Sequence, residues 1–538
     1  MGGHGQNAIS VLVVGGSLVG LSTAVFLALE GVPVAVVEKH PASSKHPRAT
    51  GFTPRTMELL SAAGLVDRIP FLVPANFRLI RARVESLAGT WYETSEWTPK
   101  KPESPAIEYS PCLGAAIPQD QLESILREKA IELGADLKFG TELVRFEQNS
   151  ERVSAVLRER GGTEYTINAA YLVAADGSGS PIREALGINR RGRGHIRTMR
   201  SVLFRAPLEE YLEKGARQFD IRQSGFEAFL TTYSDGRWVL MFADDLERDE
   251  GELLQAIIRS IGRSDLPVEI ITTGRWELQA LIAERFSSGR VFLAGDSAHT
   301  LPPTRGGYGA NTGIQDAHNL AWKLAAVVSG ASAPRLLDTY QAERHPVAWL
   351  RHQQTFARPD YKAVANGFAS DEPIIDDIAM EFGQLYRSAA VIDAGSDLPV
   401  ALRPDQWAGQ PGTRAPHHWI SKGGGGERIS TLDLFHRGWV LLAENEGWVP
   451  AVSLAVARIG IQLRCVRTGI DIVAADRGAF RSAFGLGDAG ASLIRPDGFV
   501  AWRSVGMPAD PARALIDAFG SVSCAWESSG STSSNSQI

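Results

Sequence analysis

The sequence predicts an α/β protein of several domains that begins with a Rossmann-like, nucleotide-binding unit. Its 538 residues are more than one ordinary domain holds. The chain starts with a strand, a glycine-rich turn, a helix and a second strand, which is the order of a parallel βαβ unit. Two later strand–turn–helix segments carry motifs that fit the same ligand site, so we expect this first domain to be discontinuous.

The N-terminal unit is expected to bind the phosphates of a nucleotide. Its turn follows the pattern G-x-G-x-x-G, except that Ser17 stands where the middle glycine is usual. Gly15 permits the tight turn, and Gly20 lets the helix and the strand pack closely. The helix N-terminus offers free N–H groups to a pyrophosphate, and Glu38 can accept hydrogen bonds from a ribose. The expected strand, helix and second strand cover residues 9–14, 18–29 and 34–37.

Ser17 adds a Cβ atom and a hydroxyl group to this turn. We expect the backbone to stay slightly farther from the phosphates, and the hydroxyl could itself donate to a phosphate oxygen. An ordinary glycine-rich turn of another α/β protein is the alternative, and this stretch alone leaves it open.

Two later segments strengthen the prediction of a nucleotide site. The first follows a short strand and fits D-G-x-x-S-x-x-R from Asp176 to Arg183. In the second, a strand leads into Asp296, then into a Gly/Pro loop and a helix that begins near Asn311. Asp296 is placed to bind a hydroxyl-rich chain such as a ribityl group, and the helix start could face a ring carbonyl. Each dipeptide alone is a common turn former, but chance explains their order and spacing poorly.

Composition argues against several classes of function. The net charge is -6, and no basic block would follow the phosphates of a nucleic acid. No apolar run reaches the roughly 20 residues that span a bilayer. The three cysteines are far apart, which excludes a C-x-x-C motif, and His299 has no second ligand at metal spacing. We expect a cytoplasmic protein with no nucleic-acid, membrane or metal partner.

The middle of the chain, residues 200–276, is expected to form alternating strands. Residues 226–245 read as a hairpin with its turn at residues 234–236. Such a sheet could roof an aromatic pocket, and the alternative is an ordinary hydrophobic sheet face. Strand geometry puts three residues on one face before the turn, and three share a face after it: Phe229, Thr231 and Tyr233, then Trp238, Leu240 and Phe242.

Taken together, these motifs resemble the FAD-dependent aromatic hydroxylases, the class A flavoprotein monooxygenases. The resemblance is strongest to the branch of phenol hydroxylases and of hydroxylases of aromatic polyketides such as anthracyclines. It is supported by "HPRATGFTPRTMELL", "IPQDQLESIL" and "LLDTYQAERHPVA". It covers most of the chain and is weakest near residues 70–110 and 195–275. It implies FAD as cofactor, NADPH or NADH as electron donor, and dioxygen and a phenolic or polycyclic aromatic compound as substrates.

The resemblance also assigns roles to single residues. Glu38 would hold the adenosine ribose, and Arg48 would lie along the phosphates and the ribityl chain. Gln119 would contact the flavin, and Asp296 would bind the ribityl hydroxyls. Pro303 and residues 307–311 would line the isoalloxazine ring. The cofactor-binding positions implied in this way are Gly15, Gly16, Ser17, Leu18, Val19, Gly20, Glu38, Lys39, Arg48, Gln119, Val144, Asp176, Arg183, Gly295, Asp296, Pro303, Gly307, Gly309, Ala310 and Asn311.

Some positions depart from the family pattern or allow a second interpretation. Leu18 stands where the family often has proline, and Arg305 makes the Gly/Pro loop one residue longer than usual. Arg48 and Arg183 could be surface charges, and Gln119 could only cap the helix that follows it.

The resemblance implies a hydroxylation by way of a flavin hydroperoxide that the electron-rich substrate ring attacks. The sequence identifies no residue as a catalytic base. Tyr233, Arg358 and Tyr361 are candidates for substrate activation by location only. Epoxidation, Baeyer–Villiger oxidation and a FAD-binding protein without turnover remain alternatives. The W-x-W-x-I-P motif of many halogenases is absent.

The C-terminal part resembles the thioredoxin-like domain of the same branch, through "STLDLF", "GWVLLA" and "ASLIRPDGFVAWR". Cys465 has no C-x-x-C partner, so the expected role is packing or homodimer contacts. The predicted domains are a FAD-binding domain at 1–75, 112–190 and 276–400, a substrate-binding sheet domain at 76–111 and 191–275, a thioredoxin-like domain at 404–525 and a disordered tail at 526–538.

Overall fold

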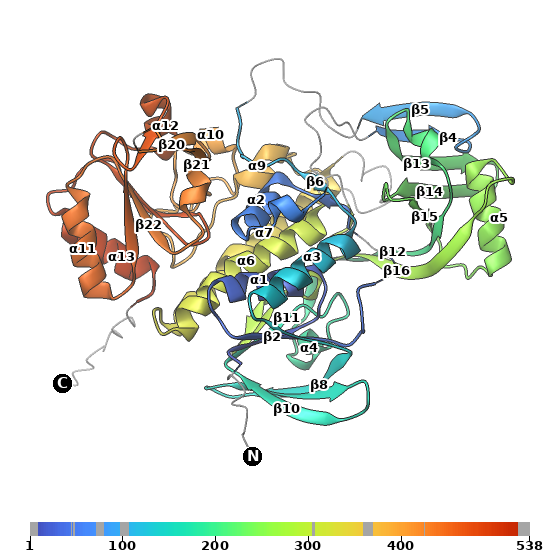
Figure 1. Cartoon of the computed structure of the whole chain (residues 1–538), viewed down its shortest axis with the longest axis horizontal. Coiled ribbons are helices and arrows are strands. Elements are labelled where there is room, and N and C mark those ends of the chain that lie inside the picture. Colours follow the sequence, from blue (N-terminus) through green and yellow to red (C-terminus); the bar gives the residue numbers. More distant parts are fainter. Residues whose placement is uncertain are drawn as a thin grey trace. The chain divides into compact units, whose positions relative to one another are not determined.

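The computed structural model describes residues 9–44, 46, 49–70, 80–96, 107–303, 307–358, 370–423 and 425–525. The chain divides into two compact units (Figure 1). The first comprises Met1–Val25, Val34–Ala317 and Ala348–Ile374, and the second comprises Phe26–Pro33, His318–Val347 and Ile375–Ile538. No helix in the described part of the chain combines the length and the apolar character that crossing a membrane requires. The finer domain boundaries and the disordered tail remain predictions, and the tail lies outside the described residues.

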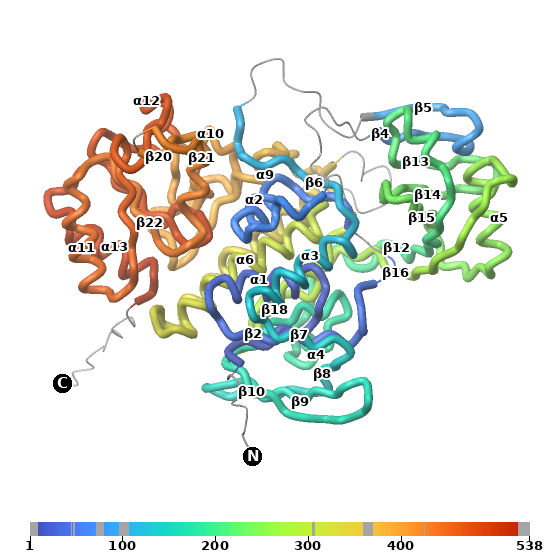
Figure 2. Tube along the Cα trace, in the orientation of Figure 1, coloured from blue at the N-terminus to red at the C-terminus, as the bar shows by residue number. Residues whose placement is uncertain are grey.

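The first unit contains a six-stranded sheet of Rossmann-like topology. Its strands, in spatial order, are β17 (Ser287–Ser288), β18 (Val291–Leu293), β11 (Tyr171–Ala174), β1 (Val11–Val14), β2 (Val34–Glu38) and β7 (Asp136–Phe139). All neighbours from β18 to β7 pair in parallel, and β17 is antiparallel to β18. β1 and β11 are fully buried apolar strands, as expected inside a parallel sheet. The trace in Figure 2 shows how distant segments of the chain meet in this sheet.

Helices and two small sheets complete this part. The small sheets are β10 (Glu164–Ala169), β9 (Val153–Glu159) and β8 (Thr141–Gln148), and β3 (Gly51–Phe52) with β6 (Ala115–Ala116). The helices that lie wholly or partly in the first unit, beside α5 described below, are α1 (Leu18–Leu29), α2 (Pro54–Ala62), α3 (Gln119–Glu132), α4 (Pro181–Ala185), α6 (Tyr308–Val328) and α7 (Asp338–Ala357).

The predicted middle strands form a second, eight-stranded sheet in the first unit. In spatial order they are β19 (His299–Thr300), β16 (Glu269–Ala283), β12 (Arg190–Arg205), β15 (Arg237–Phe242), β14 (Phe226–Thr232), β13 (Ala216–Gln223), β4 (Ile80–Val84) and β5 (Trp91–Glu96). The prediction of strands alone over 200–276 is wrong, because α5 (Glu250–Ile261) interrupts them. A capping box between Asp249 and Glu252 starts this helix, and Gly262 ends it in the left-handed region.

The turn at 234–236 sets which residues of the two hairpin strands pair. The pairing decides which side chains lie on the same face of the sheet. Thr231 pairs with Val239, and Thr232 pairs with Trp238. Trp238, Leu240 and Phe242 therefore pack under α5, in one core with Leu253 and Ile257 of that helix. The face that carries Phe229, Thr231 and Tyr233 is the opposite one, where Tyr233 packs with Leu203 and Val239. Within the described part of the chain, α5 packs on the first face, so we expect the second face to be the one that roofs a pocket.

The second unit contains the predicted thioredoxin-like sheet. Its order is β23 (Leu463–Arg467), β22 (Trp439–Ala443), β25 (Ala491–Ile494) and β26 (Val500–Ser504). β22 and β23 are parallel and joined through α11 (Trp448–Ile459), while β25 and β26 form an antiparallel hairpin followed by α13 (Pro511–Val522). The remaining elements are β20 (Trp419–Lys422), β21 (Arg428–Ser430), β24 (Ile472–Ala474), α9 (Asp377–Phe382), α10 (Pro404–Trp407) and α12 (Arg477–Phe484).

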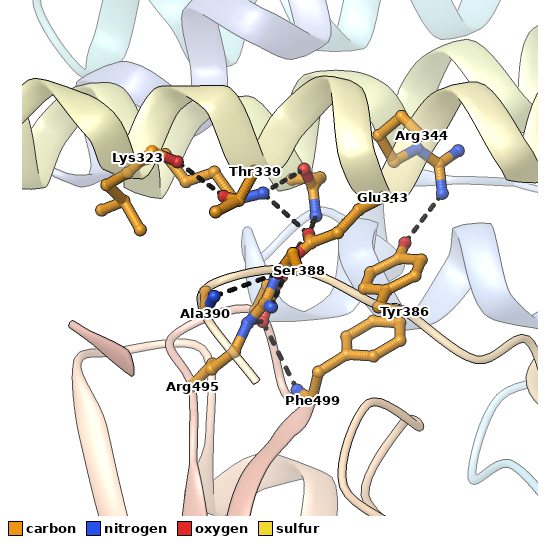
Figure 3. Close-up of polar contacts among 12 residues, drawn as sticks. Lys323, Thr339, Glu343, Arg344, Tyr386, Ser388, Ala390, Arg495 and Phe499 are labelled. Carbon is orange, nitrogen blue, oxygen red and sulfur yellow. Dashed lines mark hydrogen bonds and ion pairs between the residues drawn. The ribbon is translucent and has the colours of Figure 1, made fainter. Parts of the chain in front are cut away.

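A buried charge network in the second unit joins the β25–β26 turn to α6 and α7 (Figure 3). Both oxygens of Glu343 accept from the guanidinium of Arg495, at 2.6 and 2.9 Å. The ammonium of Lys323 donates to Glu343 at 2.7 Å, and the hydroxyl of Ser388 donates to it at 2.7 Å. Arg495 also pairs with Asp497. The ionic side chains are essentially fully buried, so each charge depends on its partners.

Candidate cofactor site and neighbouring sheet face

The turn between β1 and α1 (residues 15–17), which the sequence predicts to be a phosphate turn, is shaped by backbone contacts that only glycine permits. Gly15 has φ +105°, and a Cβ there would overlap the carbonyl oxygen of Ala175. A Cβ at Gly20 would overlap the carbonyl oxygen of Gly15. At Gly16 a Cβ would lie 2.8 Å from the Cβ of Glu38. The turn is thus pressed against both β11 and β2, and the first helical turn, with buried Leu18, follows directly.

Glu38, at the end of β2, faces this turn. Its Oε2 accepts from the N–H of Gly16 at 2.7 Å, and its Oε1 accepts from the N–H of His40 at 2.8 Å. A carboxylate oxygen has further lone pairs, so a ribose hydroxyl can still donate to it. The neighbouring Lys39 is exposed. Arg48 lies outside the described residues.

The hydroxyl of Ser17 is engaged by α3. It donates to Oε1 of Glu123 at 2.6 Å and accepts from Nε2 of Gln119 at 3.1 Å. Gln119 is the first residue of α3, and the N-cap position of this helix is Pro118. The amide oxygen of Gln119 accepts from the N–H of Ala49 at 3.2 Å. Sequence reasoning missed Glu123, although it lies one turn after Gln119 in the same motif.

The D-G-x-x-S-x-x-R motif begins beside the phosphate turn and starts α4. Among the described residues, Oδ1 of Asp176 is buried without a hydrogen-bond partner, while Oδ2 accepts from the N–H of Ile182 at 3.3 Å. Burial raises the pKa of the Asp176 carboxyl. Arg183 is 2% exposed, so the surface-charge interpretation is wrong. It donates to the carbonyl oxygens of Ser178 at 3.1 Å and Ser297 at 3.0 Å, which ties this motif to the next.

The Gly295–Asp296 motif sits against the first turn of α1. A Cβ at Gly295 would lie 2.7 Å from Cγ2 of Val19, and a Cβ at Gly313 would lie 2.5 Å from the same atom. Asp296 is half-buried at the end of β18. Behind it, the fully buried His299 contacts Oδ2 of Asp316 through Nε2 at 2.6 Å, and the same oxygen accepts from the N–H of Gly295 at 3.3 Å.

Helix α6 starts at Tyr308, three residues before the predicted start near Asn311. Asn311 is 1% exposed, and its Oδ1 accepts from Thr56 at 2.6 Å and from the N–H of Thr53 at 3.0 Å. Its Nδ2 donates to the carbonyl oxygen of Gly307 at 2.8 Å. Its side chain therefore links the start of α6 to Thr53 and Thr56. Pro303 and Gly307 are exposed, Gly309 and Ala310 are half-buried, and Arg305 lies outside the described residues.

The residues present fit a flavin dinucleotide. Three motifs that lie far apart in the sequence meet around the N-terminus of α1, and the turn is a cradle that a side chain would fill. The donor set offers backbone N–H groups for phosphates and the carboxylates of Glu38 and Asp296 for hydroxyls. The buried oxygen of Asp176 points to a polar ligand. Val144 lies at a bulge of β8, between Leu143 and Arg145.

The catalytic candidates occupy two places in the first unit. Arg358 is buried at the end of α7, and its guanidinium donates to the hydroxyl of Tyr308 at 3.3 Å. Tyr233 is buried at the hairpin end of the sheet face, and burial raises the pKa of its phenol. Tyr361 lies outside the described residues. Sequence reasoning missed His46, whose Nε2 lies 2.9 Å from Oγ of Ser201 on β12.

Comparison with known proteins assigns the family. The sequence matches the FAD binding domain family over residues 8–355 and the family described as aromatic-ring hydroxylase, C-terminal, over residues 408–522. It is 40% identical to 4-methyl-5-nitrocatechol 5-monooxygenase of Burkholderia sp., across 96% of this chain and 98% of the relative. It is 38% identical to tetracenomycin B2 monooxygenase-dioxygenase of Streptomyces olivaceus, across 95% and 97%.

Among solved structures, the chain matches aklavinone-11 hydroxylase in a ternary complex with FAD and aklavinone. The TM-score is 0.85 at 36% identity, over 97% of this chain and 100% of the other. These matches span the three cofactor motifs, the eight-stranded sheet and the thioredoxin-like domain. The chain therefore belongs to the FAD-dependent aromatic-ring hydroxylases, a family of flavoprotein monooxygenases, and its cofactor is FAD.

Proposed function

We propose that this monooxygenase hydroxylates a phenolic ring of a polycyclic aromatic compound, with NADPH or NADH as electron donor. The observation that carries this proposal is the end-to-end likeness to a hydroxylase whose structure holds FAD together with aklavinone. Tetracenomycin B2 monooxygenase-dioxygenase, a second relative, supports a polycyclic substrate. The nitrocatechol relative supports the other candidate, a substrate with a single ring.

The cradle residues bind and orient the cofactor. In this proposal the N-terminus of α1 receives the pyrophosphate, Glu38 the adenosine ribose and Asp296 the ribityl hydroxyls. The start of α6 would lie along the ring. FAD, once bound and reduced, supplies the reductive activation of dioxygen. The protein contributes position and exclusion of water.

The face of the eight-stranded sheet that carries Tyr233 supplies an apolar wall for the substrate. Leu203, Tyr233 and Val239 form its buried core, with Met241 and Ile271 half-buried beside them. Such a wall suits a flat aromatic ring system. A phenol with a raised pKa stays protonated at neutral pH, so Tyr233 would donate a hydrogen bond rather than remove a proton.

We propose that a cation, rather than a base, activates the substrate. A buried guanidinium next to a phenol favours the phenolate and lowers the phenol pKa. Arg358 is the candidate with a described environment, and Tyr361 remains a candidate from the sequence. Cytoplasmic location and a homodimer likewise remain predictions.

Product analysis under oxygen-18 gas tests the proposal. The FAD-loaded protein is incubated with NADPH, or with NADH, and either single-ring phenols and catechols or tetracyclic phenolic quinones. One heavy oxygen atom on an aromatic carbon of a tetracyclic compound is the expected result. Labelling of the single-ring compounds alone would select the other candidate. An epoxide or a lactone would identify one of the alternative oxidations, and peroxide as the sole product with every compound would contradict the proposal.

A further inference from the structure

Ser17 breaks the glycine pattern of the phosphate turn, and the protein itself uses its hydroxyl. Ser17 donates to Oε1 of Glu123 at 2.6 Å and accepts from Nε2 of Gln119 at 3.1 Å. The amide of Gln119 also donates to Oε1 of Glu123 at 2.8 Å. Because a serine hydroxyl has one proton, the proton given to Glu123 is not available to a phosphate oxygen. Glu123 is 3% exposed, so its carboxylate needs these donors.

The hydrogen bonds continue from this triangle to the other end of the cradle. The N–H of Gln119 donates to the carbonyl oxygen of Ala49 at 2.9 Å, and Oε1 of Gln119 accepts from the N–H of Ala49 at 3.2 Å. Two residues later, the carbonyl oxygen of Gly51 accepts from Nδ2 of Asn311 at 3.2 Å. The N–H of Thr53 donates to Oδ1 of Asn311 at 3.0 Å. These hydrogen bonds, together with the backbone from Ala49 to Thr53, form a relay from the start of α1 to the start of α6.

We propose that Ser17 is a positioning residue, which acts through Glu123 and Gln119 to hold the cradle in the shape that receives FAD. It is not a ligand of the phosphates. The ligand is FAD, the cofactor of the family. The binding of its pyrophosphate by the phosphate turn and of its ring by the start of α6 rests on the proposed function. A cradle that is fixed before binding loses less conformational freedom when the ligand enters, so the relay raises affinity without a contact of its own.

Amide hydrogen exchange in the full-length protein without FAD tests the relay by itself. Ser17→Ala removes the hydroxyl, whereas Ser17→Thr keeps it and serves as the matched control. We expect faster exchange of the Ala49 and Gln119 amides in Ser17→Ala, with wild-type rates in Ser17→Thr. Unchanged exchange in Ser17→Ala would overturn the proposal, whatever ligand the cradle takes.

Equilibrium titration with FAD then separates positioning from direct phosphate binding. A hydrogen bond of ordinary net strength corresponds to a loss of about three- to tenfold in FAD affinity for Ser17→Ala. In a Glu123→Met background the same substitution should cost less, because Ser17 then has only Gln119 as a partner. Gln119→Met replaces this background if Glu123→Met does not fold.

A second titration uses ADP, which carries the phosphates without the flavin. Ser17→Ala should weaken FAD more than ADP, since the relay ends at the α6 start. Equal losses for FAD and ADP, independent of Glu123, would identify a phosphate ligand and overturn the proposal. A wild-type protein that binds neither compound would contradict the function itself, while the exchange measurement would still decide the role of Ser17.

Discussion

Gly15 shows how strongly single positions of the cofactor turn are constrained. Its positive φ strains any other residue, and a Cβ would overlap the carbonyl oxygen of Ala175. The sequence pattern predicted this position correctly, because a tight turn after a buried strand needs glycine. It could not predict the side-chain partners of Ser17, because Glu123 approaches only once α3 has folded against the turn.

Substitution of Gly15 by alanine should abolish FAD loading of the purified protein. The added methyl group cannot be placed without moving β11 or the turn itself. Gly161→Ala is the matched control, because among the described residues its Cβ would meet no atom within 4 Å. The ratio of flavin to protein absorbance measures the outcome. A Gly15→Ala protein that carries FAD at the wild-type ratio would show that the turn is not the cofactor cradle.

Arg358 should control the pH dependence of hydroxylation. If its buried charge favours the substrate phenolate, Arg358→Ala shifts the rise of activity with pH upward by about one unit or more, whereas Arg358→Lys keeps most of the wild-type profile. Initial rates of product formation across pH at saturating substrate measure this shift. An unchanged profile in Arg358→Ala would remove Arg358 from the activation step.

At the scale of elements, the sequence predicted those helices and strands that local interactions determine. The strand–helix–strand unit at 11–38 was predicted almost residue by residue, because burial and glycine punctuation both mark it. Helix α5 has its own signal, the capping box at Asp249, which the strand interpretation overlooked. The two hairpin faces could not be assigned from alternation alone, because the turn length decides which residues pair.

The buried network around Glu343 should be essential for stability. Glu343→Gln leaves the buried cations Lys323 and Arg495 without their shared carboxylate, and we expect a loss of about 3–5 kcal/mol in unfolding free energy. Lys422→Ala, at an exposed pair with Glu427, is the control and should change stability by less than about 1 kcal/mol. Chemical unfolding measures both. A wild-type midpoint for Glu343→Gln would contradict this assignment.

His352 on α7 should make stability depend on acid pH. Burial, followed by the charge of Arg193, lowers its pKa from 6.5 to about 4, so the folded protein resists its protonation. Between pH 7 and pH 5 the unfolded chain takes up this proton first, and stability falls by about 2 kcal/mol from this group. In the wild type the rings of His352 and Trp349 stack with their centroids 5.2 Å apart, and His352→Phe keeps an aromatic ring at this position. The midpoint of thermal unfolding should vary less with pH in the variant than in the wild type. The same pH dependence in both proteins would show that His352 is not the group responsible.

At the scale of the whole molecule, the order of motifs predicted more than any one motif. The glycine turn alone left the ligand open, whereas the turn, Asp176 and Asp296 together supported the resemblance that implies FAD. The fold explains this, since β1, β11 and β18 are neighbours in one parallel sheet and bring the three motifs to its same edge. The substrate could not be predicted, because the sheet face that we propose as its wall is built from ordinary apolar residues.

Anaerobic rapid-mixing reduction of the FAD-loaded protein by NADPH and by NADH tests the central claim most directly. The flavin absorbance is followed with and without a tetracyclic phenolic ligand. An aromatic hydroxylase should be reduced faster with the ligand bound, and admission of oxygen should then yield a product heavier by one oxygen atom. Reduction that ignores every aromatic compound, or a protein that cannot be loaded with FAD, would contradict the account.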